Sequence, residues 1–318
     1  MEYKFTPKKY YFLYGKAEPA LKLKPGDVVE TSTVDARGYD SAGKPLSEES
    51  KAVEGDYIPL YSNPLVGPFY VEGAEPGDTL SVYIEKVKPN RDYAWSRILP
   101  HFGSFTEEGP RRRFLLNEPI EEKVFDWKLD LDRNVAILQL QNSKLKRVEI
   151  PLHPFIGSIG VAPRFGRRET ALTPGEYGGN MDCIETKEGT TLYLPVFVKG
   201  AYLYFGDVHA AQGDGELTGV ALEVSADVKL KIDLIKGKSI EWPRLEDEEF
   251  IMVAGSSRPL MEALKIAHVE LVRWLVEDYG FDKWEAFEIL SQVGKCRIGN
   301  VVDPCYTVVA KFPKKYLP

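Results

Sequence analysis

The side chains that could perform chemistry are concentrated in one stretch, Gly178 to Glu223. Two glycine-bracketed clusters in it carry groups able to bind a metal ion or move a proton: Asn180, Asp182, Glu185, Asp207, His209, Asp214 and Glu216. A single residue of this kind is usually an ordinary turn or hydrogen-bonding residue. The density of carboxylates around one imidazole instead indicates a site where a divalent cation and a proton carrier could work together.

The elements that must position these two clusters lie between them. Residues 191–205 contain two β-rich apolar runs that meet at Lys199 and Gly200, a pattern typical of a hairpin with a turn glycine. A hairpin returns the chain on itself, so its two outer ends lie side by side. We therefore expect Asp182 and His209 to approach within the reach of one metal ion, held there by rigid strands.

Much of the remaining chain has the periodicity of strands. Residues 20–36 and 63–87 each show a strand, a Pro-Gly-Asp turn and a second strand, and strand periodicity returns in residues 124–140, 145–163 and 220–237. Residues 36–57 are expected to form a surface loop or flap. Residues 91–114, rich in glycine, proline and aromatic residues, are expected to form a long loop that walls a substrate pocket.

Helical patterns occur only near the C-terminus. Pro259 begins one, with apolar residues at helical spacing up to Gly280, and Asp282 is the expected N-cap of a second that includes Val293. The predicted fold class is therefore mainly β, with sandwich-like or barrel-like sheets and a smaller α+β C-terminal part. We divide the chain into an N-terminal β domain (1–149), a central β region with the metal site (150–245) and the α+β part (246–318).

Composition limits the partners of this chain. With 318 residues, of which 43% are hydrophobic, it can bury a large core, and a net charge of -7 argues against nucleic acid as a partner. There is no apolar run of transmembrane length and no signal-peptide pattern, so we expect a cytoplasmic protein without a membrane partner. Its three cysteines have no spacing that would indicate a zinc knuckle or a disulfide framework.

Five sequence blocks, in this order and spacing, resemble the acetamidase/formamidase family: PLVGPFYVEGAEPGDTL, PFIGSIGVAP, GGNMDCIETKEGTTLYLPVFVKGA, GDVHAAQGDGE and VVDPCYTVVAKFPK. The resemblance covers almost the whole chain. It implies hydrolysis of short-chain amides such as formamide and acetamide to a carboxylate and ammonia. It also implies a divalent metal, zinc in the first place with calcium as the alternative, and a homo-oligomer, a dimer or higher.

The matching blocks place particular residues in the site: Asn180 and Asp182 from GGNMD, and Asp207, His209, Gln212, Asp214 and Glu216 from GDVHAAQGDGE. We assign Asp182, Asp207 and His209 to the metal, and Asn180 and Gln212 to the substrate. An amide needs an activated water, a stabilised oxyanion and a proton donor for nitrogen. Glu216 is our choice for the proton carrier, because the flanking glycines let the backbone aim it, and Glu223 and Glu185 are its rivals.

Two alternatives remain open at this point. Cys183 could be the nucleophile of an amidase, with Glu185 as its base and Lys187 or Lys199 as partner. Alternatively, the chain could be a β-rich protein that binds a structural calcium ion through Asp182, Asp207, Asp214 and Glu216. Analysis of the bound metal would separate these hypotheses.

Overall fold

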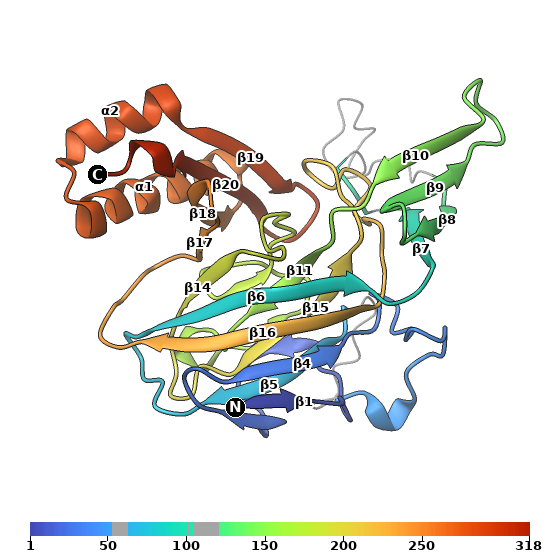
Figure 1. Ribbon diagram of the computed structural model, residues 1–318, viewed down its shortest axis with the longest axis horizontal. Helices are drawn as coiled ribbons and strands as arrows, with labels where there is room; N and C mark the ends of the chain where they lie inside the picture. Colours follow the sequence, from blue (N-terminus) through green and yellow to red (C-terminus); the bar gives the residue numbers. More distant parts are fainter. Residues whose placement is uncertain (53–62, 101, 105–120) are drawn as a thin grey trace, which may run out of the picture.

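The computed structural model describes residues 1–52, 63–100, 102–104 and 121–318 (Figure 1). These residues form a mainly β structure with two α-helices near the C-terminus, which confirms the predicted fold class. The strands belong to sheets of nine, five, four and two strands. The two large sheets build the body of the molecule, and strands of the five-stranded sheet carry the core of the candidate site.

The nine-stranded sheet takes strands from all three predicted regions of the chain. From edge to edge its members are β1 (Glu2–Lys4), β4 (Val28–Ser32), β16 (Ala226–Ile235), β6 (Thr79–Pro89), β14 (Thr191–Pro195), β17 (Arg244–Glu246), β18 (Phe250–Ser257), β20 (Tyr306–Pro313) and β19 (Lys295–Asn300). β1 pairs with β4 in parallel, and the other neighbours are antiparallel. This shared sheet joins the three regions in one layer, and the domain boundaries stay predictions.

The five-stranded sheet packs against the nine-stranded one. Its members, in order, are β13 (Gly178–Asn180), β11 (Phe155–Gly160), β15 (Leu203–His209), β5 (Leu65–Val71) and β3 (Leu21–Leu23). One hydrophobic cluster unites fully buried side chains of both sheets, such as Leu80 and Leu192 from the larger and Phe69 and Phe205 from the smaller. Burial of this apolar surface is the main force that holds the sandwich together.

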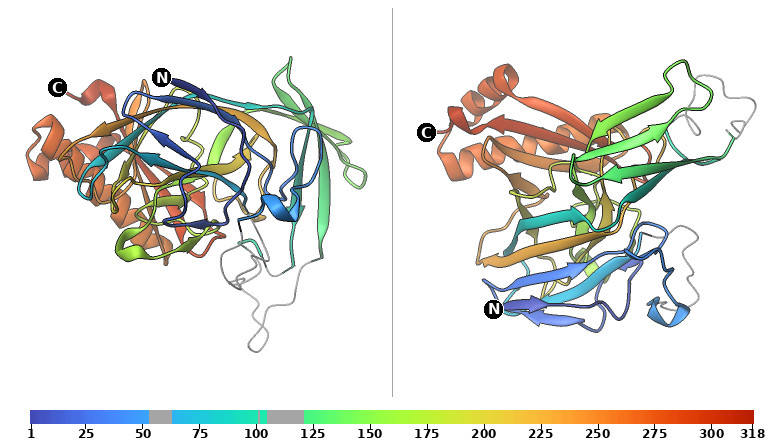
Figure 2. Two further views of the ribbon diagram at one scale, coloured as in Figure 1. Left: turned by 90° about the horizontal axis from the view of Figure 1, so that it is seen from below. Right: turned by 45° about the vertical axis from the view of Figure 1, so that its right-hand side comes forward.

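The four-stranded sheet projects from the body on the side away from the helices (Figures 1 and 2). Its members, in order, are β10 (Arg147–Pro151), β9 (Val135–Gln139), β8 (Lys123–Asp130) and β7 (Tyr93–Ile98). β2 (Leu13–Tyr14) and β12 (Glu169–Thr170) form the remaining small sheet.

The loop predicted for residues 91–114 is wrong for Tyr93–Ile98, which form β7. This segment has a full antiparallel partner in β8, and its Ala94 and Trp95 are buried, so packing overrides its mixed composition. Residues 101 and 105–114 lie outside the described residues. In the predicted loop at 36–57, the described part contains turns and a short 3-10 segment (Glu48–Ser50), and residues 53–57 lie outside the described residues.

The two Pro-Gly-Asp turns carry the chain from one layer of the sandwich to the other. Each turn begins after a strand of the five-stranded sheet, β3 or β5, and ends at a strand of the nine-stranded sheet, β4 or β6. Asp27 and Asp78 cap their turns alike, each accepting a hydrogen bond of 2.8 Å from the backbone N–H three residues earlier. The intervening Gly26 and Gly77 have φ of 87° and 93°, a conformation that favours glycine.

The hairpin predicted for residues 191–205 is wrong. β14 pairs with β6 and β17 in the larger sheet, whereas β15 pairs with β11 and β5 in the smaller one. The turn at Lys199 and Gly200 exists, but it joins the two layers instead of two neighbouring strands. β15 is buried along its whole length, and Leu192 and Leu194 of β14 are buried in the core that the two sheets share, so the two strands lie on opposite sides of this core.

The two helices begin and end where the sequence predicts. α1 (Leu260–Tyr279) is followed by Gly280 in the left-handed conformation, and α2 (Lys283–Val293) is capped by Asp282, whose carboxylate accepts the N–H groups of Trp284 and Glu285. Both helices share a second hydrophobic cluster with β18 and β20. Within the described residues, no helix is both long and apolar enough to span a bilayer.

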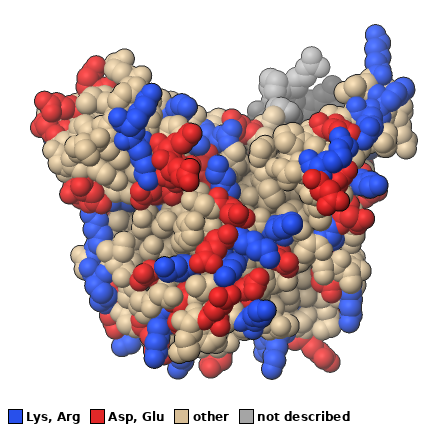
Figure 3. Space-filling model, in the orientation of Figure 1, with Lys and Arg blue, Asp and Glu red and all other residues tan. Residues whose placement is uncertain are grey.

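Charged side chains of both signs are interspersed over the face shown in Figure 3. Exposed ion pairs such as Arg133 with Glu149, 2.7 Å apart, are of this kind. Pairs so exposed contribute little to stability, because water and salt screen them. The charges that need an explanation are the buried ones described next.

Candidate active site

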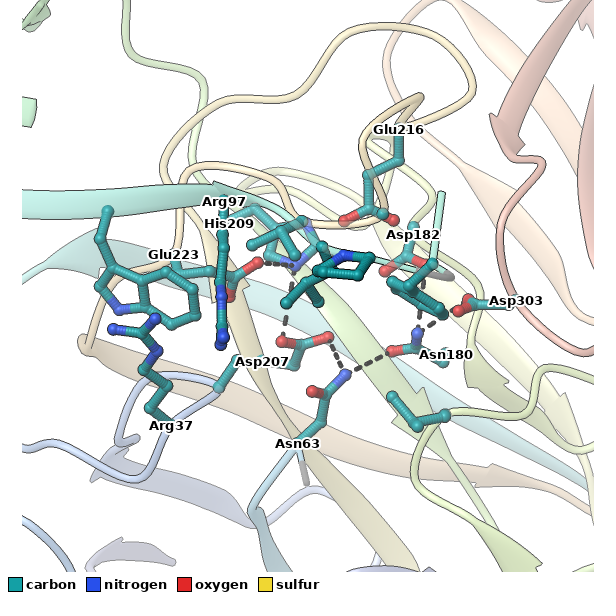
Figure 4. A pocket seen from close by; sticks show the side chains of 18 residues that line it. Arg37, Asn63, Arg97, Asn180, Asp182, Asp207, His209, Glu216, Glu223 and Asp303 are labelled. Carbon is teal, nitrogen blue, oxygen red and sulfur yellow. Dashed lines mark hydrogen bonds and ion pairs between the residues drawn. The ribbon is translucent and has the colours of Figure 1, made fainter. Parts of the chain in front are cut away.

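The two polar clusters converge beside the end of β15, on a cavity of about 540 Å³ (Figure 4). Asp207 and His209 stand two residues apart on β15 and therefore on the same face of the strand. Asp182 follows the end of β13, and its carboxylate meets them there. Ligand atoms of these three buried residues lie within 4.8 Å of one another. The expected proximity of Asp182 and His209 is thus observed, and their role as ligands stays a prediction.

β11 brings the two clusters together in place of the hairpin. It pairs with β13 on one side and with β15 on the other, so the two segments are next-nearest neighbours in the sheet. Gly157 of β11 lies directly under the site. A Cβ at this position would stand 2.8 Å from the Asp207 carbonyl oxygen and 3.0 Å from both Asp182 Oδ1 and His209 Cε1. Only a residue without a side chain lets these groups approach so closely.

Three acidic residues of the site have backbones in the left-handed region, which side chains other than glycine rarely adopt. The φ angles of Asp182, Asp207 and Glu216 are 46°, 56° and 48°. Such a conformation costs on the order of 1 kcal/mol or more per residue and persists where the surroundings enforce it. Here it turns three carboxylates towards one point, which is typical of a site built for function.

Glu216 and Glu223 complete the ring of carboxylates. The backbone of Glu223 forms bridges with both His209 and Trp95, so this residue is clamped between the end of β15 and β7. Its Oε1 lies 3.4 Å from His209 Nε2. Glu216 comes from the turn that follows Gly213 and lines the cavity. Ligand atoms of His209, Glu216 and Glu223 also lie within 4.8 Å of one another.

Gln212 determines which nitrogen of His209 faces the cluster. Its amide Nε2 donates to the carbonyl oxygens of Asp182 and Gly299, each at 3.0 Å, so its Oε1 must face the imidazole. That oxygen lies 2.8 Å from His209 Nδ1 and accepts the proton there. Nε2, which faces Asp207 and Glu223, then carries the lone pair that a metal would take. The geometry favours a positioning role for Gln212, and its predicted contact with substrate stays untested.

Asn180 is the centre of a second hydrogen-bond network beside the carboxylates. Its Nδ2 donates to Asp303 Oδ2 at 2.8 Å and to Asp182 Oδ2 at 3.2 Å. Its Oδ1 accepts from Asn63, at 3.1 Å, and from the Ser158 hydroxyl. All the hydrogen-bonding capacity of the amide is engaged by protein groups, so Asn180 holds carboxylates in place here. Its predicted contact with substrate also stays untested.

Burial dominates the electrostatics of this cluster. It raises the pKa of Glu216 to about 7 and raises the pKa values of Asp182, Glu223 and Asp303 well above their usual range, since neighbouring carboxylates add to the effect. Burial alone would lower the pKa of His209, but the carboxylates of Glu223 and Asp207 outweigh it and raise that pKa well above its usual value. The arrangement therefore places excess negative charge in a region with little water.

The residues present fit a bound divalent cation. Asp182 Oδ1 and Glu223 Oε2 are buried and have no hydrogen-bond partner in the part of the chain that the structure describes. His209 Nε2 lies 3.5 Å from Asp207 Oδ1 and 3.4 Å from Glu223 Oε1. Two ligand atoms about 2.1 Å from one tetrahedral ion would be about 3.4 Å apart. Within the described part of the chain, no Lys or Arg pairs with the carboxylates of this cluster: Asp182, Asp207, Glu216, Glu223 and Asp303.

Two of the residues considered from the sequence lie outside the site. Asp214 is exposed and forms an ion pair with Arg297 at 2.8 Å, so the calcium set that includes it is not assembled. Glu185 is buried elsewhere, paired with Lys311, and it accepts a hydrogen bond of 3.1 Å from the Cys183 thiol. Neither Glu185 nor Asp214 lines the cavity.

Cys183 has the surroundings of a structural thiol. Its side chain is completely buried, and burial together with the Glu185 carboxylate raises its pKa well above the usual value. A nucleophilic cysteine needs the opposite, a lowered pKa and access to substrate. The proposed lysine partners are also absent from its hydrogen bonds and ion pairs in the described residues, since Lys199 pairs with Glu75 on the surface and Lys311 is the lysine beside Glu185.

Sequence reasoning missed three polar residues that the fold adds to the site. Asp303 belongs to the block VVDPCY, but an aspartate before proline there also reads as an ordinary turn residue. Asn63 donates to Asp207 Oδ2 at 2.7 Å, and Ser158, in the glycine-rich strand β11, donates to the same oxygen at 3.2 Å. Nothing in the sequence near Asn63 or Ser158 distinguishes them from other loop and strand residues.

The other wall of the cavity is aromatic and basic. Trp95 and Arg97 alternate with outward residues on β7, and Arg37 joins them from the segment after β4 (Figure 4). Leu99, Pro100 and Phe102 also line the cavity, as the sequence predicts for this stretch. The cavity therefore has a carboxylate-rich side and a side that carries two guanidinium groups.

Comparisons with known proteins give one family. The sequence profile described as "Acetamidase/Formamidase family" matches residues 14–170 and 164–316. An acetamidase of Yersinia enterocolitica has a similar structure, with a TM-score of 0.85, 38% identity and coverage of 100% of this chain and 93% of that one. An acetamidase of Bacillus halodurans gives a TM-score of 0.78 and 29% identity, with coverage of 99% of this chain and 98% of that one.

A curated relative is the formamidase of Methylophilus methylotrophus, 26% identical over 254 residues, which are 67% of this chain. Two curated relatives, this formamidase among them, match the chain over more than half of its length. The chain spans only 62% of the length of one of them and 61% of the length of the formamidase.

Proposed function

The chain belongs to the acetamidase/formamidase family, and from this membership and the geometry of its site we propose that it hydrolyses short-chain amides to a carboxylate and ammonia. We propose further that the reaction depends on a divalent cation. The observation that supports this most strongly is the imidazole of His209, whose Nε2 is oriented by Gln212 towards Asp207 and Glu223. Asp182 Oδ1 and Glu223 Oε2 in the same cluster are buried without a hydrogen-bond partner among the described residues.

Asp182, Asp207 and His209 would hold the cation, with Glu223 able to contribute its free oxygen. An imidazole among the ligands favours zinc over calcium, which prefers oxygen ligands only. When bound, the cation would polarise the amide carbonyl and lower the pKa of water. The neighbouring hydrogen bonds from Asn63, Ser158 and Asn180 keep the carboxylates in place for it.

Glu216 is suited to carry the proton. Its pKa of about 7 lets the carboxylate accept a proton from the attacking water and lets the carboxylic acid return it to the leaving nitrogen near neutral pH. It lines the cavity and extends from a glycine-rich turn, so it can contact a bound substrate. Glu223, backbone-paired with His209, remains the rival for this role.

Two substitutions test the proposed roles of His209 as a metal ligand and Glu216 as the proton carrier. His209→Ala should lose both the bound metal and the release of ammonia from formamide and acetamide, because the only nitrogen ligand is gone. Glu216→Gln should keep the metal and lose turnover, since the amide fills the same space but cannot accept a proton. Asp214→Asn is the matched control, because this carboxylate is exposed and lies outside the cavity. Assays with and without a chelator complete the experiment.

The outcomes separate the hypotheses. If Glu216→Gln loses its metal as His209→Ala does, Glu216 is a ligand and the proton carrier should be sought at Glu223. If chelation leaves full activity and Cys183→Ala abolishes it, the metal mechanism is refuted and a thiol mechanism takes its place. The cytoplasmic location and the homo-oligomeric state expected from the sequence stay predictions.

A further inference from the structure

Arg37 presents a positive charge to the cavity without a carboxylate partner among the described residues. Its guanidinium carbon lies 4.1 Å from the centre of the Trp95 ring, in a stacked cation–π contact. Arg37 lines the cavity, and among the described residues its side chain forms no ion pair with a carboxylate. Stacking on an indole fixes the plane of a guanidinium and leaves its N–H edge available to an anion.

A buried carboxylate holds this stack in position. Asp35 accepts hydrogen bonds from the backbone N–H of Arg37 at 3.0 Å and from the indole Nε1 of Trp95 at 2.9 Å. Asp35 is in turn fixed by Arg91, whose Nη2 lies 2.7 Å away in a fully buried ion pair. Both partners of the stack are therefore anchored to the same group, so Arg37 and Trp95 are preorganised before any ligand binds.

Arg97 adds a second cationic group to the same wall. It stands two residues from Trp95 on β7, so both side chains face the cavity. One side of its guanidinium pairs with Glu122, while its Nε is buried and has no hydrogen-bond partner among residues 1–52, 63–100, 102–104 and 121–318. A ligand or water that accepts a hydrogen bond from this donor removes the cost of leaving it unsatisfied.

The two arginines lie on the side of the cavity away from Asp182 and Asp303 (Figure 4). The backbone of Trp95 pairs with that of Glu223, so this wall borders directly on the carboxylate cluster. A cavity of about 540 Å³ holds far more than formamide or acetamide. A neutral short amide would occupy the carboxylate-rich end. Arg37 would then have no carboxylate partner among the described residues, and Arg97 Nε would have no acceptor there.

Building on the proposed function, we infer that the preferred substrate is an amide whose far end carries a carboxylate, such as the monoamide of a short dicarboxylic acid. The amide group lies at the carboxylate-rich end, and the substrate carboxylate accepts hydrogen bonds from Arg37, with Arg97 Nε as a second donor. A carboxylate matches a guanidinium in shape and charge, and the bond is stronger than one between neutral groups. The product is a dicarboxylate and ammonia.

The test compares substrates that differ only in this charge. Succinamate and succinamide have nearly the same size, but only the first carries a carboxylate, and malonamate with malonamide and glutaramate with glutaramide extend the series. For at least one length, the kcat/KM of the metal-loaded protein should be higher for the monoamide by about tenfold or more, the value of one hydrogen bond to a charged group. The preference should decrease as salt is added, because salt screens the attraction.

Substitutions assign the preference to its residues. Arg37→Met keeps an apolar side chain over Trp95 and should reduce the monoamide-to-diamide ratio about tenfold. Arg97→Gln should reduce it less, because Glu122 already neutralises part of that charge. Arg133→Met is the matched control: it removes an exposed arginine that pairs with Glu149, and the ratio should stay as in the wild type.

A binding measurement makes the outcome independent of turnover. The calorimetric affinity for succinate should exceed that for propionate, and Arg37→Met should remove most of the difference. If the wild type hydrolyses acetamide but shows no preference for any monoamide, this inference is refuted and the proposed function stands. The inference is also refuted if both Arg37→Met and Arg97→Gln keep the wild-type preference for the monoamide. If no amide is hydrolysed, the proposed function fails, and the succinate affinities alone decide whether Arg37 binds a carboxylate.

Discussion

Gly157→Ala tests whether Asp182, Asp207 and His209 can approach one another only because residue 157 has no side chain. The new Cβ would stand 2.8 Å from the Asp207 carbonyl oxygen and 3.0 Å from Asp182 Oδ1, distances that real Cβ atoms rarely or never show. β11 is fully buried and paired on both sides, so the strain cannot be relieved by moving the backbone outwards. Overpacking of this kind costs about 1–3 kcal/mol.

The strain falls on the groups that we assign to the metal, so the expected effect is twofold. The melting temperature should fall by a few degrees in a chain of this size. Zinc affinity, measured by competition with a chelator, should weaken by about 10–100-fold, as for loss of groups that support metal ligands. Gly213→Ala is the control, because nothing lies within 4 Å of its added Cβ. Wild-type zinc affinity in Gly157→Ala would refute the reasoning.

Three further predictions follow from the same contacts. Gln212→Leu should weaken zinc binding about 10–100-fold in the same competition assay, because His209 Nδ1 loses the acceptor that orients it. Gln212→Glu keeps this acceptor but loses the amide that donates to the carbonyl oxygens of Asp182 and Gly299, so it should restore only part of the affinity. Burial raises the pKa of Glu216 from 4.5 to about 7, so in metal-free protein its contribution to stability is fully present below about pH 4.5 and is lost as the pH rises through 7. Zinc competes with protons for this cluster, and the increase in melting temperature that zinc produces should therefore grow from pH 5 to about pH 8; an increase that shrinks over this range would contradict the assignment. Glu270→Ala should destabilise the chain by about 3 kcal/mol in urea unfolding, because the buried Arg244 loses its partner at 2.7 Å and keeps only Glu277 and Asp278, at 3.7 and 3.9 Å. Glu262→Ala should cost less than about 0.5 kcal/mol, since its pair with Lys265 is exposed.

Local patterns were sufficient wherever a short segment determines its own structure. The two Pro-Gly-Asp turns, the C-terminal helices and the Asp282 cap are each decided within a few residues by backbone sterics and hydrogen bonds to near neighbours. The alternation of apolar and polar residues likewise indicated many of the strands. The composition of the site was also readable, because Asp182, Asp207, His209 and Glu216 belong to dense, glycine-bracketed blocks.

The partners of each strand could not be read from the sequence. The runs that form β14 and β15 have the pattern of a hairpin, yet each belongs to a different sheet. Whether a turn joins neighbours or crosses the core depends on which arrangement buries more apolar surface in the whole molecule. The predicted proximity of Asp182 and His209 is therefore correct, but the hairpin from which it was inferred is not. Strand β11, which pairs with β13 and β15, brings the two residues together.

The sequence by itself determined which residue types are available, where both helices and many of the strands lie, and which family the chain resembles. Only the tertiary structure decided which carboxylates face the cavity. Glu185 and Asp214 are as close in sequence to the metal candidates as Glu216, yet they pair with Lys311 and Arg297, whereas Asp303 arrives from the far end of the chain. The direction of a side chain follows from the backbone angles at its own position and from strand pairing set by distant residues, and the second of these is a property of the folded molecule alone.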